Sequence, residues 1–168
     1  MIEQQGGAAP QIVEPAPLER YATFTVAGRT LLVALGQLAG VVAPTALQPL
    51  PHSSAWILGV AAWRGRAVTV VDLALLADDG VAPAAERKWL LLQWREQIVA
   101  VAVSAVGAIV TASESAVQPP LDRPDNWVLL CHPGQLHCEG RDYRCLSVEA
   151  LYDQFARSSS FVTADTQR

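Results

Sequence analysis

The sequence has few charged residues and no strongly basic region. Only 17% of its 168 residues are charged, and the formal net charge at pH 7 is −4. The basic residues are scattered singly, apart from Arg64 near Arg66 and the adjacent pair Arg87 and Lys88. A protein that neutralises nucleic-acid phosphates normally presents a basic face. The composition therefore argues against a DNA or RNA partner.

Long apolar segments are also missing. The longest, residues 98–110, is interrupted by Ser104 and Gly107, whereas a membrane-spanning helix needs about 20 apolar residues. We therefore expect this segment to be core and predict no direct membrane insertion. The first residues lack the basic and apolar regions of a secretory signal. Three cysteines cannot all pair, which fits a reducing compartment, so we expect a cytoplasmic protein.

Motifs of nucleotide-binding and catalytic sites are absent from the sequence. It has neither the glycine-rich GxxxxGK[ST] loop nor a GxGxxG motif after a strand. His52 adjoins Ser53 and Ser54, but no GxSxG motif surrounds either serine. We therefore predict no catalytic residue, no cofactor and no enzymatic activity.

One cluster of potential metal ligands needs a separate test. Five cysteine and histidine residues fall within 131–145: Cys131, His132, His137, Cys138 and Cys145. Zinc prefers such ligands, but no CxxC motif is present, and Cys138 and Cys145 fall on opposite strands of an expected hairpin. We expect buried apolar cysteines, surface histidines and no metal. A small metal-dependent or thiol redox protein that uses this cluster is the alternative from another class.

The remaining pattern predicts β-hairpins. Half of the sequence is apolar (51%), with 11 glycines and 11 prolines, which favours a packed core with many turns. One pattern occurs three times, at 22–35, 89–102 and 134–146: a strand, then a polar loop of about four residues, then a second strand. A further strand pair, 57–61 and 67–71, flanks an Arg-Gly turn. The predicted fold is all-β, built as antiparallel barrels or a sandwich.

Helices are expected at two points. Asp72 can cap a short helical turn over residues 73–77. Ser147 can cap a second helix, in which four apolar residues share one face at helical spacing: Val148, Leu151, Tyr152 and Phe155. Residues 111–126, which contain three prolines, are interpreted as a connecting loop.

The ends of the chain differ in composition from its centre. Residues 1–20 are rich in glycine, alanine and proline, and residues 157–168 are mostly polar. We therefore predict a flexible leader over 1–20, one folded domain over 21–156 and a flexible tail over 157–168. Five tryptophans are many for this length, and we expect one or two of them to reach a partner-binding groove.

The segment 50–73 carries the most specific pattern in the chain. It reads Leu-Pro, a short polar turn, Gly59-Val60, then Arg64-Gly65, an apolar strand and Asp72-Leu73. This order and spacing closely resemble the central signature of CheW-like chemotaxis adaptor domains. The likeness extends over about residues 20–155.

The resemblance implies a fold and a function. The fold would be two small five-stranded SH3-like β-barrels with short helices, including a C-terminal one. The function would be that of a non-catalytic scaffold or adaptor in bacterial chemosensory signal transduction. It would couple the helical cytoplasmic tip of a chemoreceptor (a methyl-accepting protein) to the regulatory domain of a CheA-type histidine kinase. Such a protein would be cytoplasmic and recruited to membrane-associated receptor arrays.

The resemblance also assigns partner-binding residues. The receptor tip would dock in the groove between the two barrels, and a separate face of the second barrel would meet the kinase domain. By motif position the groove candidates are Leu38, Gly59, Arg64, Gly65, Val103 and Val106. We expect a side chain at Gly59 to fill the groove, so that Gly59→Trp would weaken receptor binding without unfolding the domain. A CheW-like scaffold that localises another polar complex, without contacting CheA, is the alternative within the family.

The sequence departs from the family pattern at three places. The family usually has Val-x-Glu after the second strand, whose acid can pair with the signature arginine, whereas residues 35–40 contain no acid. Val-Asp in the second-barrel hairpin is Val103-Ser104 here, and a strand proline is Thr69. Arg64 therefore needs another partner. Together with Trp63 before the Arg-Gly pair, these departures resemble adaptors of type IV pilus (twitching motility) chemosensory systems.

Overall fold

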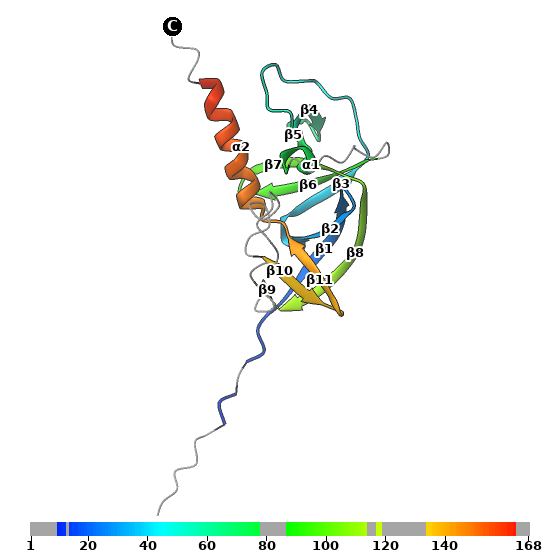
Figure 1. Ribbon diagram of the computed structural model, residues 1–168, viewed down its shortest axis with the longest axis vertical. Helices are drawn as coiled ribbons and strands as arrows, with labels where there is room; N and C mark the ends of the chain where they lie inside the picture. Colours follow the sequence, from blue (N-terminus) through cyan, green and yellow to red (C-terminus); the bar gives the residue numbers. More distant parts are fainter. Residues whose placement is uncertain (1–9, 13, 78–86, 114–116, 119–133, 164–168) are drawn as a thin grey trace, which may run out of the picture.

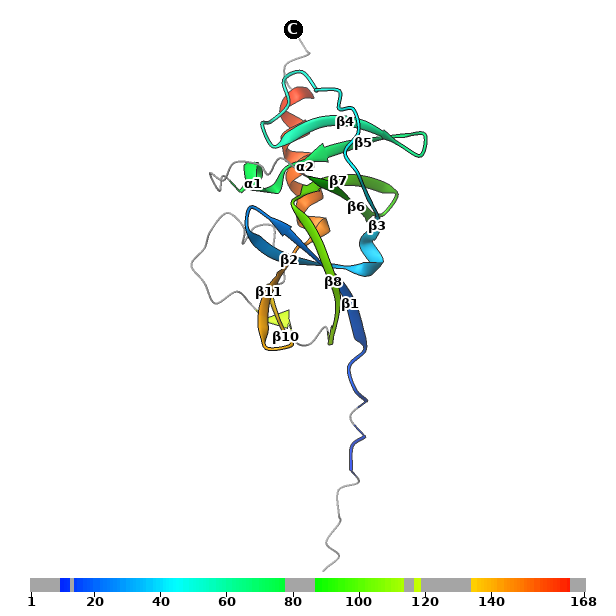
Figure 2. The same ribbon diagram turned by 90° about the vertical axis from the view of Figure 1, so that its right-hand side faces the viewer.

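The structure is a computed structural model that describes residues 10–12, 14–77, 87–113, 117–118 and 134–163. It is built mainly of β-strands, with a long C-terminal helix along one side (Figure 1). The strands form two antiparallel-rich sheets that lie one above the other in Figure 2. The predicted all-β class is confirmed.

The first sheet has strand order β8-β1-β2-β11-β10-β9. The thiol of Cys138 on β10 donates a hydrogen bond to the carbonyl of Thr111 on β8 at 3.6 Å, so the sheet curls until β10 meets β8. This barrel has its own small core, which includes Leu32 and Leu136. Its strands are β1 (Leu18–Val26), β2 (Arg29–Ala34), β8 (Ala105–Ser113), β9 (Val117–Gln118), β10 (Gln135–Cys138) and β11 (Arg141–Cys145).

The second sheet has strand order β3-β6-β7-β5-β4. A Cβ atom placed on Gly40 of β3 would lie 4.0 Å from the ring of Trp63 on β4, so the two edge strands of this sheet also meet. The predicted pair of small barrels is therefore confirmed, with the two-residue β9 as an extra strand on the first. The strands are β3 (Leu38–Val42), β4 (Ile57–Trp63), β5 (Arg66–Val71), β6 (Lys88–Trp94) and β7 (Gln97–Val103).

One buried cluster joins the two barrels. It contains Phe24 and Leu31 from the first sheet, Val71 and Leu90 from the second, and Leu151 from α2. The helices are the 3-10 turn η1 (Leu35–Gln37), α1 (Leu73–Leu76) and α2 (Val148–Thr163). We call this shared cluster the inter-barrel core. It orders the two barrels relative to each other because its burial favours one packed arrangement.

All four predicted strand pairs are present, but the predicted four-residue loops are wrong. The β1–β2, β4–β5 and β10–β11 hairpins turn through two residues, X-Gly, with positive φ at both positions. This geometry is typical of a type I′ turn, whose twist matches that of the strands. The pairs are Ala27-Gly28, Arg64-Gly65 and Glu139-Gly140.

Both predicted helix caps are confirmed. The Asp72 carboxylate accepts hydrogen bonds from the backbone N–H groups of Ala74 and Leu75, at 2.9 and 3.3 Å. Its second oxygen accepts from Arg87 at 2.6 Å, and the Asp72 residue is only 2% exposed. The Ser147 hydroxyl accepts from the N–H of Ala150 at 3.1 Å at the start of α2.

Element boundaries differ from the predictions at three places. β1 begins at Leu18, within the predicted leader, because its first residues pair with β8. α2 continues to Thr163, within the predicted tail. Residues 111–113 and 117–118 are strand rather than loop. Residues 1–9, 119–126 and 164–168 lie outside the described residues, so the flexibility of the two ends stays a prediction.

Candidate functional site

The Arg-Gly pair of the signature forms the tip of the β4–β5 hairpin. Arg64 and Gly65 have φ of +47° and +74°, and both are exposed. The guanidinium carbon of Arg64 lies 4.8 Å from the centroid of the Trp63 ring. Among the described residues no carboxylate pairs with Arg64. The contact that the structure gives Arg64 is with an aromatic ring, which attracts the cation through its quadrupole.

Gly59 lies within β4 at a bulge, not at the end of a strand. Its φ is +144°, and a Cβ atom there would lie 2.6 Å from the carbonyl oxygen of Gln48. Gln48 and Val60 exchange two backbone hydrogen bonds of 2.8 Å, which hold that chain segment against β4. The position has no room for a side chain, contrary to the expectation that one would fill a groove. The assignment of Gly59 to partner binding stays a prediction.

Three predicted groove residues meet at the inter-barrel core. Val103, at the end of β7, is buried in it, and Leu38 of β3 and Val106 of β8 are partly buried against it. These side chains come from both sheets, so the family motif positions converge where the barrels join. Arg64 and Gly65 are not part of this cluster, although the Trp63 ring beside them lies close to Gly40 on β3.

Two exposed apolar residues on the strands of Leu38 and Val106 belong to no motif in the sequence and were not predicted as site residues. Val41 on β3 is 42% exposed, and Ile109 on β8 is 50% exposed. In Figure 2 β3 and β8 both lie on the face toward the viewer, whereas α2 lies behind the sheets. A patch of large apolar side chains left in water is typical of an interaction surface. We call Leu38, Val41, Val106 and Ile109 the β3–β8 face.

A cleft of about 450 Å³ adjoins the β3–β8 face. It is lined by residues 41–43 at the end of β3, by Ser104 between β7 and β8, and by Arg87 and Lys88. Arg87 is partly neutralised by its ion pair with Asp72. The cleft thus combines an apolar wall from β3 with two cationic side chains, and this combination suits a partner that presents both apolar and acidic groups.

The tryptophans divide into two groups. Trp56 and Trp89 are buried. Trp63 and Trp94 are half-buried near neighbouring hairpin tips, and each has an arginine stacked on its ring, Arg64 and Arg95 respectively. Trp127 lies outside the described residues. Trp63 and Trp94 are therefore the described candidates for the one or two tryptophans that we expect to contact a partner.

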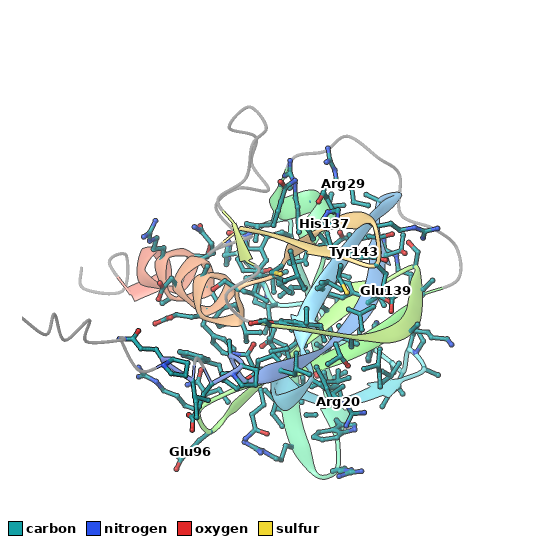
Figure 3. All side chains as sticks on the ribbon, turned by 90° about the horizontal axis from the view of Figure 1, so that it is seen from below. Arg20, Arg29, Glu96, His137, Glu139 and Tyr143 are labelled. Carbon is teal, nitrogen blue, oxygen red and sulfur yellow. The ribbon has the colours of Figure 1, made fainter. Side chains whose placement is uncertain are left out.

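The cysteine and histidine cluster does not form a reactive site in the described residues. Cys138 and Cys145 are buried, and burial raises the pKa of the Cys145 thiol to about 11. A neutral thiol is a poor nucleophile and a poor metal ligand. His137 is exposed and pairs with Asp142 at 2.6 Å. Figure 3 shows His137 with Glu139 and Tyr143 on the β10–β11 hairpin.

Two further observations concern metals and membranes. No group of three or more metal-ligating side chains occurs in the part of the chain that the structure describes. Cys131 and His132 fall outside that part. Among the described helices, none is both long and apolar enough to cross a membrane.

Comparisons with known proteins place the chain in a family. Residues 20–155 match the CheW-like domain. The chemotaxis protein CheW of Rhizobium meliloti (strain 1021) is 27% identical over 117 residues, which cover 69% of this chain and 76% of that protein. The probable chemotaxis protein CheW of Rhizobium etli is 29% identical over 106 residues, covering 62% and 68%.

A solved structure supports the same assignment at the level of the fold. The crystal structure of the scaffolding protein TtCheW from Thermoanaerobacter tengcongensis has a TM-score of 0.68 to this chain at 17% identity. The similarity covers 84% of this chain and 91% of that one. Since the family match spans most of the sequence and the barrels agree with it, this chain belongs to the CheW-like domain family.

Proposed function

We propose that this chain is an adaptor that couples the cytoplasmic helical tip of a chemoreceptor to the regulatory domain of a CheA-type histidine kinase. Members of the family are non-catalytic scaffolds of chemotaxis signalling. The observation behind the proposal is the convergence of Leu38, Val103 and Val106 at the inter-barrel core, together with the exposed Val41 and Ile109 on strands β3 and β8. The adaptor would act in the cytoplasm, where membrane-associated receptor arrays recruit it.

The β3–β8 face suits a helical partner. A helix binds an apolar groove by inserting residues at i, i+3, i+4 and i+7. In such a complex the half-buried Leu38 and Val106 would contact the partner helix at depth. The more exposed Val41 and Ile109 would contact it nearer the surface. The cations of the adjoining cleft, Arg87 and Lys88, would attract acidic side chains on the same helix.

Charge introduced on the β3–β8 face should weaken receptor binding. Val41→Lys and Ile109→Lys place a cation where the receptor helix would bury apolar surface, so each should raise the Kd for a receptor-tip fragment by about tenfold or more. Isothermal titration calorimetry gives this Kd. Both residues are exposed, so the variants should keep their circular dichroism spectra.

Leu75→Lys is the matched control. Leu75 is 45% exposed on α1, which lies on another side of the molecule in Figure 2, so the receptor Kd should stay unchanged. Binding of the CheA regulatory domain should survive in Val41→Lys and Ile109→Lys, because the proposal places the kinase on a separate face. Unaltered receptor affinity in both Val41→Lys and Ile109→Lys would refute the groove assignment.

We further propose that the adaptor serves a type IV pilus chemosensory system. The support is the absence of an acid from residues 35–40 and the replacement of an acidic partner of Arg64 by Trp63. Capture experiments with receptor tips and kinases from pilus and flagellar systems test this assignment. Capture of the pilus components is expected, and exclusive capture of the flagellar ones would contradict it.

A further inference from the structure

A second cavity lies on the opposite side of the second barrel from β3. It has a volume of about 300 Å³ and lies between α2 and strands β5 and β7. Its apolar wall consists of Trp56, Ile98, Val99, Leu151 and Phe155. The Trp56 and Phe155 rings meet edge to face, with centroids 6.1 Å apart and planes at 84°. The cavity therefore offers a preformed aromatic surface, as small-molecule sites commonly do.

One wall of this cavity carries a buried hydroxyl group. The Tyr152 Oη atom is inaccessible to solvent, and none of the described residues supplies a hydrogen-bond partner for it. Burial raises the pKa of this phenol to about 12, while the nearby charge of Arg66 acts in the opposite direction. The group is therefore a neutral donor at physiological pH. A buried polar group without a partner is uncommon in folded proteins. Because solvent does not reach this hydroxyl, a ligand in the cavity would contact the ring of Tyr152 rather than its oxygen.

Arg66 supplies a cation to the same cavity from β5. One of its terminal nitrogens donates to the backbone carbonyl of Glu96 at 2.9 Å, which holds the guanidinium in place. A guanidinium has several N–H donors in a planar fork, so this bond leaves others able to bind a ligand. Glu96 also borders the cavity, but its side chain extends away from the body of the protein in Figure 3.

These groups define one class of ligand. We propose that the cavity binds a small amphipathic carboxylate, whose aromatic or alkyl body packs against Trp56 and Phe155 and whose carboxylate pairs with Arg66. An anion is favoured because Arg66 carries a positive charge and has N–H donors free for a ligand. A cavity of about 300 Å³ is at the lower end of the range for small-molecule sites and is too small for a folded partner.

Binding would connect α2 to the second barrel. Tyr152 and Phe155 belong to α2, whereas Arg66 and Ile98 belong to β5 and β7. A ligand in contact with all four stabilises the packed position of α2, because binding to the folded state alone raises its stability. The site is distinct from the β3–β8 face, so its test does not depend on receptor coupling.

The probe that tests the site is 3-phenylpropionate, with 3-phenylpropanol as its uncharged counterpart. We expect saturable one-to-one binding of the carboxylate by calorimetry, with a change in tryptophan fluorescence and a rise in Tm. The alcohol should bind more weakly, because it loses the ion pair with Arg66. Arg66→Gln should weaken binding of the carboxylate by about tenfold or more.

Arg95→Gln is the control with the same change of charge. Arg95 lies on the neighbouring β6–β7 hairpin tip over the Trp94 ring and does not line the cavity, so its variant should bind the probe like the wild type. The proposal is overturned if millimolar 3-phenylpropionate shows no saturable binding. It is equally overturned if Arg66→Gln and Arg95→Gln have the same affinity as the wild type.

Discussion

Gly59 and Gly65 belong to the same β-hairpin, and the backbone needs glycine at each for a different reason. Gly65 has φ of +74° in a two-residue turn, and a Cβ atom there would meet nothing within 4 Å. Gly59 has φ of +144°, and its Cβ atom would collide with the carbonyl of Gln48. The first glycine serves the turn, and the second permits close approach of another chain segment.

Even the smallest side chain at Gly59 should destabilise the domain. Gly59→Ala must shift the Gln48 backbone and strain φ, so we expect a loss of about 2 kcal/mol or more in the free energy of unfolding. Urea unfolding followed by circular dichroism measures this. Gly36→Ala is the control, because its Cβ atom meets nothing within 4 Å and its φ is not in the positive region. Equal unfolding midpoints for the two variants would show that the close approach of Gly59 to Gln48 does not affect stability.

Arg64 shows what sequence reasoning can and cannot predict about a single residue. The missing acid in residues 35–40 indicated that Arg64 needs a different partner, and this followed from the family pattern alone. The identity of that partner did not follow, because stacking depends on the rotamers of Arg64 and Trp63 at a turn with positive φ. Adjacent residues on a strand point to opposite faces, so sequence proximity gave no reason to pair them.

At the scale of elements, patterns among residues close in sequence predicted hairpins and helix caps correctly. Pairings between strands far apart in sequence were not predicted. The hairpins and both helix caps depend on residues close in sequence, and all were found. β8 was missed because, among the described strands, it pairs with β1 alone, where Tyr21 pairs with Val110. Its exposure also lacks regular alternation, since Gly107, Ala108 and Ile109 are all exposed. No local periodicity marked this strand.

The candidate site depends on these missed elements. Leu38, Val103 and Val106 were assigned from motif position, and their convergence became visible only with β3 and β8 in place. Val41 and Ile109 carried no motif. Their exposure follows from how the two edges of the barrels pack, which a single sequence does not encode in any local pattern. Arg87, the half-buried ion-pair partner of the buried Asp72, was missed for the same reason, because the ion pair joins α1 to the start of β6.

At the scale of the whole molecule, the two barrels share one core. Residues from both sheets and from α2 form the inter-barrel core, so the barrels pack as one unit. If receptor and kinase bind to different faces, the shared core fixes the distance and orientation between them, and the adaptor transmits receptor state through geometry.

Bridging between receptor and kinase can be measured in a retention assay. A receptor-tip fragment is immobilised, and retention of the CheA regulatory domain is measured with and without this chain. We predict that the wild-type chain increases kinase-domain retention. The combined variant Val41→Lys and Ile109→Lys should lose this effect although it still binds the kinase domain in solution. Kinase-domain retention that is the same with wild-type chain, variant or no chain would contradict the account.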